Sequence, residues 1–104
     1  MVAPYNPPAK GEDFICRIAL TSANDARAFK ASPTIAAGDF KVDKDGAGLA
    51  NLATLPTVDP AGSVLVKVSL SAAEMGGDVV TLVCIDQTTP KEWADLVISI
   101  PTTA

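Results

Sequence analysis

The sequence of 104 residues contains no histidine. Histidine is the commonest general base and the commonest transition-metal ligand in proteins, so a Ser-His-Asp or Cys-His catalytic arrangement cannot be built from this chain alone. The only two cysteines, Cys16 and Cys84, have no histidine beside them, which disfavours a structural zinc site. We therefore expect a protein that is not an enzyme and that holds neither a metal nor a cofactor.

An excess of positive charge is also missing. Eight Lys and Arg residues stand against twelve Asp and Glu residues, which gives a net charge of −4. Nucleic acids and anionic membrane surfaces attract basic proteins, so neither is an expected partner. No apolar run approaches the ~18–20 residues that span a bilayer.

A charged segment followed by an apolar segment is missing from the N-terminal stretch "MVAPYNPPAKGED", so we expect no signal peptide. The protein is then expected in a cytosol, where thiols stay reduced. Two buried, reduced cysteines are the favoured interpretation of Cys16 and Cys84. A disulfide between them, or to another chain, is the alternative.

Hydrophobic residues make up 48% of the chain and charged residues 19%, a balance typical of one folded domain. Residues 1–12 are expected to form an extended arm, because Pro4, Pro7 and Pro8 exclude a regular helix or a central strand. Such an arm gains order only against a partner. The predicted organisation is an arm over residues 1–12 and a single β-domain over residues 13–104.

Period-two alternation of apolar residues predicts strands through the domain. In "DFICRIALTSA" one side carries Phe14, Cys16, Ile18 and Leu20, and "SVLVKVSL" alternates most regularly. The segment "DVVTLVCID" is apolar on both sides, which predicts a strand covered on both faces. The segment "ADLVISI" closes the chain as a further strand.

Turn signals separate these segments. Asp45-Gly46 predicts a hairpin, and Ser71 with Glu74 forms a capping-box pattern that ends at Gly76-Gly77. A short strand is expected near residues 27–30. Turns recur roughly every ten residues, which predicts an all-β fold: an antiparallel immunoglobulin-like β-sandwich of about 6–8 short strands.

No group of residues points to catalysis. The "DKDG" stretch at residues 43–46 resembles the start of a calcium loop, but the further ligands are absent at the required spacing. A hairpin tip is the better interpretation. The carboxylates are scattered and most stand at turns, where Asp makes local hydrogen bonds.

Trp93 is the only tryptophan and stands between two predicted strands. It fits three roles: a binding platform, a plug for the core, or an anchor in an interface with another chain. A carbohydrate platform usually has several exposed aromatic rings. We favour a plug that covers the open end of the sandwich, with its N–H bonded to a loop carbonyl.

The second half of the chain resembles a class of small virion domains of tailed bacteriophages. The matching residues are Asp45-Gly46, the segment 70–75 ("LSAAEM") and the segment 90–95 ("PKEWAD"), and the resemblance covers roughly residues 36–100. It implies an immunoglobulin-like sandwich that serves as a structural module on capsids, necks, tails or fibres. It carries no active-site residues, and the arm is not part of it.

From this resemblance we expect a non-enzymatic virion structural protein, made in the host cytoplasm. The favoured role is a capsid decoration or cement protein, with the major capsid protein or other virion proteins as partners and with many copies or a homo-oligomer such as a trimer. The expected interface residues are Pro4, Tyr5, Pro7, Pro8 and Trp93. The alternatives are a neck, tail or baseplate accessory, and a host glycan or receptor-binding module that would use Phe29 and Trp93.

Overall fold

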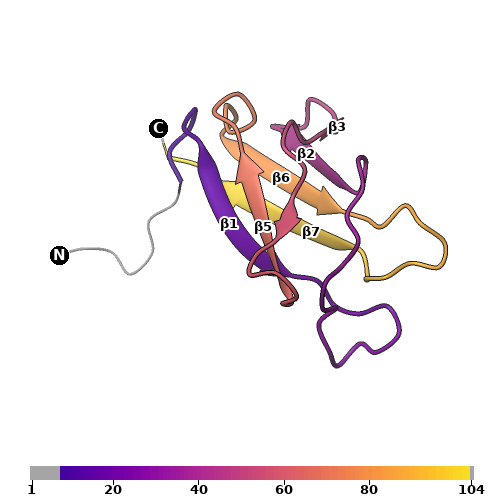
Figure 1. The fold of residues 1–104 in the computed structure, drawn as a ribbon. Helices are drawn as coiled ribbons and strands as arrows, with labels where there is room; N and C mark the ends of the chain where they lie inside the picture. The colour runs from indigo at the N-terminus through magenta and orange to yellow at the C-terminus, as the bar shows by residue number, and fades with distance from the viewer. Residues whose placement is uncertain (1–7, 104) are drawn as a thin grey trace.

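The computed structural model describes residues 8–103. Seven strands build two antiparallel sheets that pack face to face (Figure 1). The strands are β1 (Phe14–Ala19), β2 (Phe40–Lys44), β3 (Ala50–Asn51), β4 (Thr57–Val58), β5 (Leu65–Leu70), β6 (Val79–Cys84) and β7 (Leu96–Pro101). The all-β sandwich predicted from the alternation is confirmed.

The strand order identifies the type of sandwich. One sheet has the order β1-β5-β4 and the other has the order β3-β2-β6-β7. These orders correspond to the B-E-D and C′-C-F-G sheets of immunoglobulin-like domains. Among residues 8–103, no strand takes the place of strand A, which in such domains lies beside strand B. The outer edge of β1 is therefore not paired with another strand of the described chain.

The core lies between the two sheets and follows the period-two alternation. Val66, Val68 and Leu70 of β5 face Val80, Leu82 and Cys84 of β6 across the interior, and all six are buried. The remaining buried apolar residues are Leu20, Phe40, Val42, Met75, Trp93 and Ile100. On β1, Phe14, Cys16 and Ile18 point inward as predicted but are only half-buried.

Two local expectations are wrong. The described residues cover one face of β6 only, because Val79 is 41% exposed and Val83 is half-buried on the other face. The expected strand near residues 27–30 is a turn followed by a single bridge between Thr21 and Phe29. The surrounding Ala-rich segment, residues 23–38, has no apolar alternation long enough to sustain a strand.

The predicted turns are present in atomic detail. Asp45 and Gly46 both adopt positive φ, 54° and 82°, and the Ala47 N–H donates to the Lys44 carbonyl at 3.0 Å, so the two residues are the centre of a β-turn at the tip of the β2–β3 hairpin. Asp43 accepts hydrogen bonds from the N–H groups of Gly46 and Gly48, both at 2.8 Å. The "DKDG" stretch therefore folds as a hairpin tip.

The capping box is also formed. The Ser71 N–H donates to Glu74 Oε1 at 2.8 Å, and the Glu74 N–H donates to Ser71 Oγ at 3.2 Å. The box closes one turn between β5 and β6, and Met75 at its end is fully buried. No continuing helix follows within the described residues, because Gly76-Gly77 ends the turn.

The described end of the arm lies against the C-terminal segment. Ala9 bridges Thr103, the Thr103 N–H donates to the Pro8 carbonyl at 2.9 Å, and the Lys10 N–H donates to the Thr103 carbonyl at 2.8 Å. Three of the expected interface residues, Pro4, Tyr5 and Pro7, lie outside the described residues. No helix within residues 8–103 has the length and apolar character needed to cross a bilayer.

Candidate protein-interaction surface

The outer face of the four-stranded sheet carries apolar side chains that no other described part of the chain covers. Val83 lies directly opposite Val97, and Thr81 lies opposite Ser99, on the neighbouring strands β6 and β7. Val97 is 61% exposed, and Leu49 at the margin is 55% exposed. We call this surface the open face; its residues are Lys41, Asp43, Leu49, Val79, Thr81, Val83, Ile85, Val97 and Ser99.

The open face is nearly neutral in an acidic chain. Within its strands the only charged side chains are Lys41 and Asp43, one of each sign, both on β2, and the Lys91–Asp95 ion pair lies just before β7. The outer face of the other sheet differs, because Arg17 lies directly opposite Lys67, and Arg17 pairs with Asp59 at 2.9 Å. Clustered charges are typical of a hydrated surface, whereas an apolar face with few charges is typical of a surface that a partner covers.

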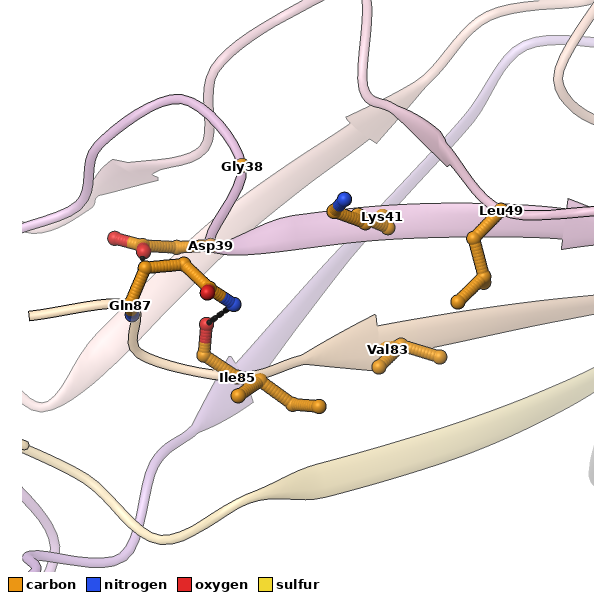
Figure 2. A pocket seen from close by; sticks show the side chains of 7 residues that line it. All are labelled: Gly38, Asp39, Lys41, Leu49, Val83, Ile85 and Gln87. Carbon is orange, nitrogen blue, oxygen red and sulfur yellow. Dashed lines mark hydrogen bonds between the residues drawn. The ribbon is translucent and has the colours of Figure 1, made fainter.

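A shallow hollow lies at one end of the open face (Figure 2). It has a volume of about 200 Å³, and Lys41, Leu49, Val83, Ile85 and Gln87 are among its lining residues. The Gln87 amide donates to the Ile85 carbonyl at 3.1 Å, which closes its rim. Small-molecule sites usually enclose about 300–1,000 Å³, so the hollow fits a protruding side chain of a partner better than a whole ligand.

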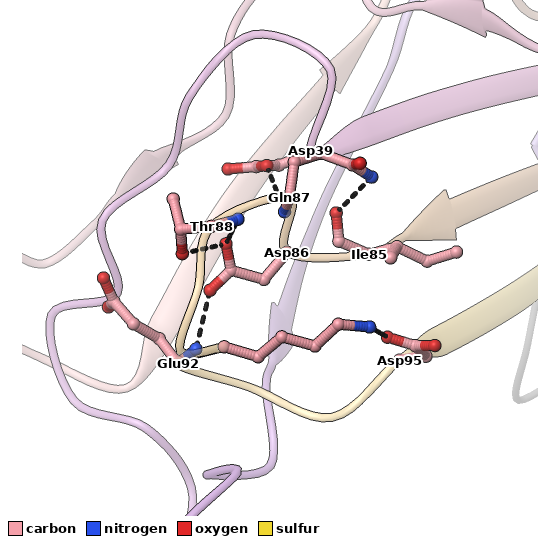
Figure 3. Close-up of polar contacts among 8 residues, drawn as sticks. Asp39, Ile85, Asp86, Gln87, Thr88, Glu92 and Asp95 are labelled. Carbon is pink, nitrogen blue, oxygen red and sulfur yellow. Dashed lines mark hydrogen bonds and ion pairs between the residues drawn. The ribbon is translucent and has the colours of Figure 1, made fainter.

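The loop that follows β6 is held to the sheet by a buried carboxylate. Asp39, 1% exposed, stands just before β2. Its carboxylate accepts a hydrogen bond from the Ala36 N–H at 2.8 Å. It accepts a second from the Gln87 N–H at 3.0 Å, which Figure 3 shows. One side chain therefore joins the loop before β2 to the loop after β6, and fixes the end of the open face where the hollow lies.

A second buried carboxylate organises the same loop internally. Asp86 Oδ1 accepts hydrogen bonds from the Thr88 hydroxyl at 2.6 Å and the Thr88 N–H at 2.9 Å, and Oδ2 accepts one from the Glu92 N–H at 2.6 Å (Figure 3). Burial by itself would raise the pKa of Asp86, but the hydrogen bonds from Thr88 and Glu92 outweigh it and hold the pKa below its ordinary value. Asp86 is therefore ionised at neutral pH, and both of its carboxylate oxygens accept hydrogen bonds.

Neither carboxylate is free for chemistry. Their oxygens already accept backbone and hydroxyl hydrogen bonds, which is the role of Asp in turns. Among residues 8–103, no three Asp, Glu or Cys side chains gather in a way that would hold a metal ion. Sequence reasoning missed both residues as organisers; the only signal was an Asp at the end of a strand with a Thr two positions later.

Trp93 closes the loop end of the sandwich from inside. It is fully buried, and its ring lies 6.1 Å from the ring of Phe40, centroid to centroid, at an angle of 52°. Its backbone bridges Ser22, which joins the loops after β1 and β6. The favoured interpretation as a core plug agrees with this burial, and Trp93 presents no surface to a partner in this conformation.

The detail expected for the Trp93 N–H is wrong. The indole N–H is buried and has no hydrogen-bond partner within residues 8–103, instead of the expected loop carbonyl. The backbone on either side of Trp93 is paired with the loop after β1: the Ala94 N–H donates to the Thr21 carbonyl, and the Ala23 N–H donates to the Glu92 carbonyl. The loop is therefore held by its backbone, and the indole contributes apolar contact.

The two cysteines form no disulfide within the described residues and lie in the sandwich interior. Cys84 is fully buried on β6 and Cys16 is half-buried on β1. Burial, with a smaller effect from Cys16, raises the pKa of Cys84 to about 12, and burial also raises the pKa of Cys16. Both thiols are therefore neutral and poor nucleophiles near pH 7.

No family model matches the chain, no curated protein is significantly similar to it, and no solved structure matches it. The residues and their geometry are therefore the basis for a functional proposal.

Proposed function

We propose that the chain is a non-enzymatic structural protein that docks onto a protein assembly through its open face. The observation that carries this proposal concerns the two faces of the strand β6. Its sequence is that of a strand covered on both faces, yet residues 8–103 cover only one of them. A partner that packs on Val83 and Val97 would complete the missing layer.

The composition of the open face indicates what kind of partner fits. A neutral apolar surface with a single Lys41 and a single Asp43 suits a flat protein surface rather than a nucleic acid or an anionic membrane. The hollow beside Ile85 would receive one protruding side chain of that surface. The rest of the chain is acidic, so a neutral or basic partner surface is favoured over another acidic one.

The resemblance to virion domains of tailed bacteriophages supplies the specific form of the proposal. In that form the protein is a decoration or cement protein, its partner is the major capsid protein or another virion protein, and many copies cover the head. A neck, tail or baseplate accessory uses the same surface on a different partner. The arm over residues 1–12 would add contacts beyond the sandwich.

The alternative as a glycan- or receptor-binding module is weakened by the structure. Trp93 is fully buried, so it offers no stacking surface. Phe29, at 58% exposure, is the single strongly exposed aromatic side chain among the described residues. One isolated ring on a loop is a poor platform for a sugar.

Co-sedimentation tests the proposal. The purified protein is mixed with purified phage heads and, separately, with purified tails, and the pellets are analysed. Binding to heads supports decoration, and binding to tails alone moves the protein to the neck, tail or baseplate. Binding to neither particle, with binding to host cells, would overturn the structural role in favour of the recognition module.

A further inference from the structure

Among residues 8–103, β1 and β7 are the two long edge strands of the sandwich, with six residues each, and β1 is the one that contains no proline. The edge strands β3 and β4 have two residues each, and β7 ends in Pro101. Short strands and prolines are the devices that keep strand edges from pairing with other chains. The six residues of β1 contain neither a proline nor a break in register, and they pair only with β5 among the described residues.

The core is also open along this edge. The inward residues of β5 are fully buried, whereas Phe14, Cys16 and Ile18 on β1 remain half-buried. On the outward side, Ile15 is 55% exposed. A further strand beside β1 would complete the backbone hydrogen bonds of the edge and would cover this apolar rim at the same time.

We propose that β1 pairs antiparallel with β1 of a second copy of this chain, so that two sandwiches share one continuous sheet. A twofold axis makes the contact self-complementary, because the same edge serves both copies. The second copy supplies a strand of suitable kind: extended, apolar on its inward side and free of proline. This contact is separate from the open face and leaves that face available.

The register of the two paired β1 strands is set by the face to which each side chain points and by the charge of Arg17. Residues directly opposite each other in an antiparallel pair must point to the same face, which leaves two registers that overlap the strands most fully. One places Arg17 opposite Arg17 of the second copy, and like charges in that position are unfavourable. The other places Cys16 opposite Cys16 and Ile15 opposite Arg17, and it is the one we infer.

In the inferred register the charges also complement each other. Arg17 lies opposite Ile15 of the second copy, so its two diagonal neighbours there are Asp13, within reach of its long side chain, and Arg17. The charge of Arg17 is already offset by Asp59 in its own copy, at 2.9 Å, so the two arginines of the dimer are each paired. Inward, Phe14 lies opposite Ile18 of the second copy, which joins the two half-open cores.

The test combines the mass in solution with a cross-link. Size-exclusion chromatography with light scattering should show a concentration-dependent dimer of the full chain. Mild air oxidation with copper phenanthroline should link Cys16 to Cys16 of the second copy, and peptide mapping distinguishes this link from any that involves Cys84. Facing residues of an antiparallel pair lie within the distance that a disulfide bridges.

Ile15→Lys is the decisive variant, with Leu65→Lys as its matched control. Both side chains are exposed on the same outer face, but only Ile15 lies on the edge strand. Ile15→Lys places a positive charge opposite Arg17 of the second copy and should raise the dimer Kd by about tenfold or more. Leu65→Lys should leave the Kd unchanged.

Three results would overturn the inference. The first is a monomer at all concentrations, which would mean that the edge needs no second copy. The second is a dimer that Ile15→Lys leaves intact, or one whose cross-linked peptides do not join Cys16 to Cys16. The third is a dimer that is lost when residues 2–7 are deleted, which would identify the arm as the segment that joins the copies.

Discussion

Trp93 and Phe40 pack against each other at one end of the sandwich and hold the loop between β6 and β7 on the core. Their ring centroids lie 6.1 Å apart, and both side chains are buried. Phe40 starts β2 and Trp93 follows the loop after β6, so this contact ties the loop to the same sheet that carries the open face. The position of the only tryptophan is thus explained by packing.

Replacement of Trp93 tests this role. Trp93→Ala should lower the free energy of unfolding by ~3–5 kcal/mol, because it leaves a large cavity beside Phe40. Trp93→Phe keeps an aromatic contact and removes the unpartnered N–H, so its loss should be smaller. Urea unfolding measures both variants. A Trp93→Ala protein of unchanged stability that fails to assemble would instead make Trp93 an interface anchor.

The buried Asp86 predicts a loss of stability in acid. Its pKa is lower in the folded chain than in the unfolded chain, so its contribution is present above an unfolded pKa of about 4 and is lost as the pH falls through the folded value. Asp86→Asn should lose roughly 2–4 kcal/mol at pH 7 and show a weaker acid dependence.

Urea midpoints at a series of pH values measure this effect. Asp95→Asn is the matched control, because the Asp95 carboxylate is half exposed and, among the described residues, pairs with Lys91 alone, at 2.8 Å. Asp95→Asn should keep the acid dependence of the unaltered chain. The same acid dependence in Asp86→Asn and in the unaltered chain would show that Asp86 does not cause it.

The capping box at Ser71 stabilises the turn between β5 and β6. Ser71→Ala removes the bond that Ser71 Oγ accepts from the Glu74 N–H and should lower the free energy of unfolding by about 1 kcal/mol. Ser69→Ala, two residues earlier on the outward side of β5, should have almost no effect. Thermal or urea unfolding compares the two; equal losses would contradict a specific role for the box.

The arm divides into two parts with different expected effects. Deletion of residues 2–7 should leave the thermal midpoint nearly unchanged and should weaken binding to particles. Deletion of residues 2–12 should lower the midpoint, because it also removes the backbone bonds to Thr103 and Met75 and the ion pair of Lys10 with Asp78. If deletion of residues 2–7 unfolded the domain, this result would contradict the role of these residues as an assembly contact.

Much of the fold follows from local patterns. The alternation on β1 and β5, the positive φ that Asp45-Gly46 adopt, and the spacing of Ser71 and Glu74 are each decided within a few residues. The strand expected near residues 27–30 does not form, because no such local pattern is present there and the chain turns instead.

The candidate surface was harder to predict. The sequence of β6 indicates two covered faces, but whether the chain or a partner supplies the second cover depends on contacts far along the sequence. Trp93 remained ambiguous because tryptophan serves both cores and interfaces. Asp39 and Asp86 were missed because an Asp at a strand end is common, and only the folded loop brings Ala36, Gln87 and Glu92 to their carboxylates.

The most direct test of the open face is co-sedimentation of two charge variants with phage heads. Val97→Lys alters the open face, and Leu65→Lys places the same charge on the outer face of the other sheet; both positions are exposed, so both proteins should fold. We predict that the unaltered chain and Leu65→Lys sediment with heads, and that Val97→Lys binds at least about tenfold more weakly. Equal binding by Val97→Lys and the unaltered chain would contradict the open face as the docking surface.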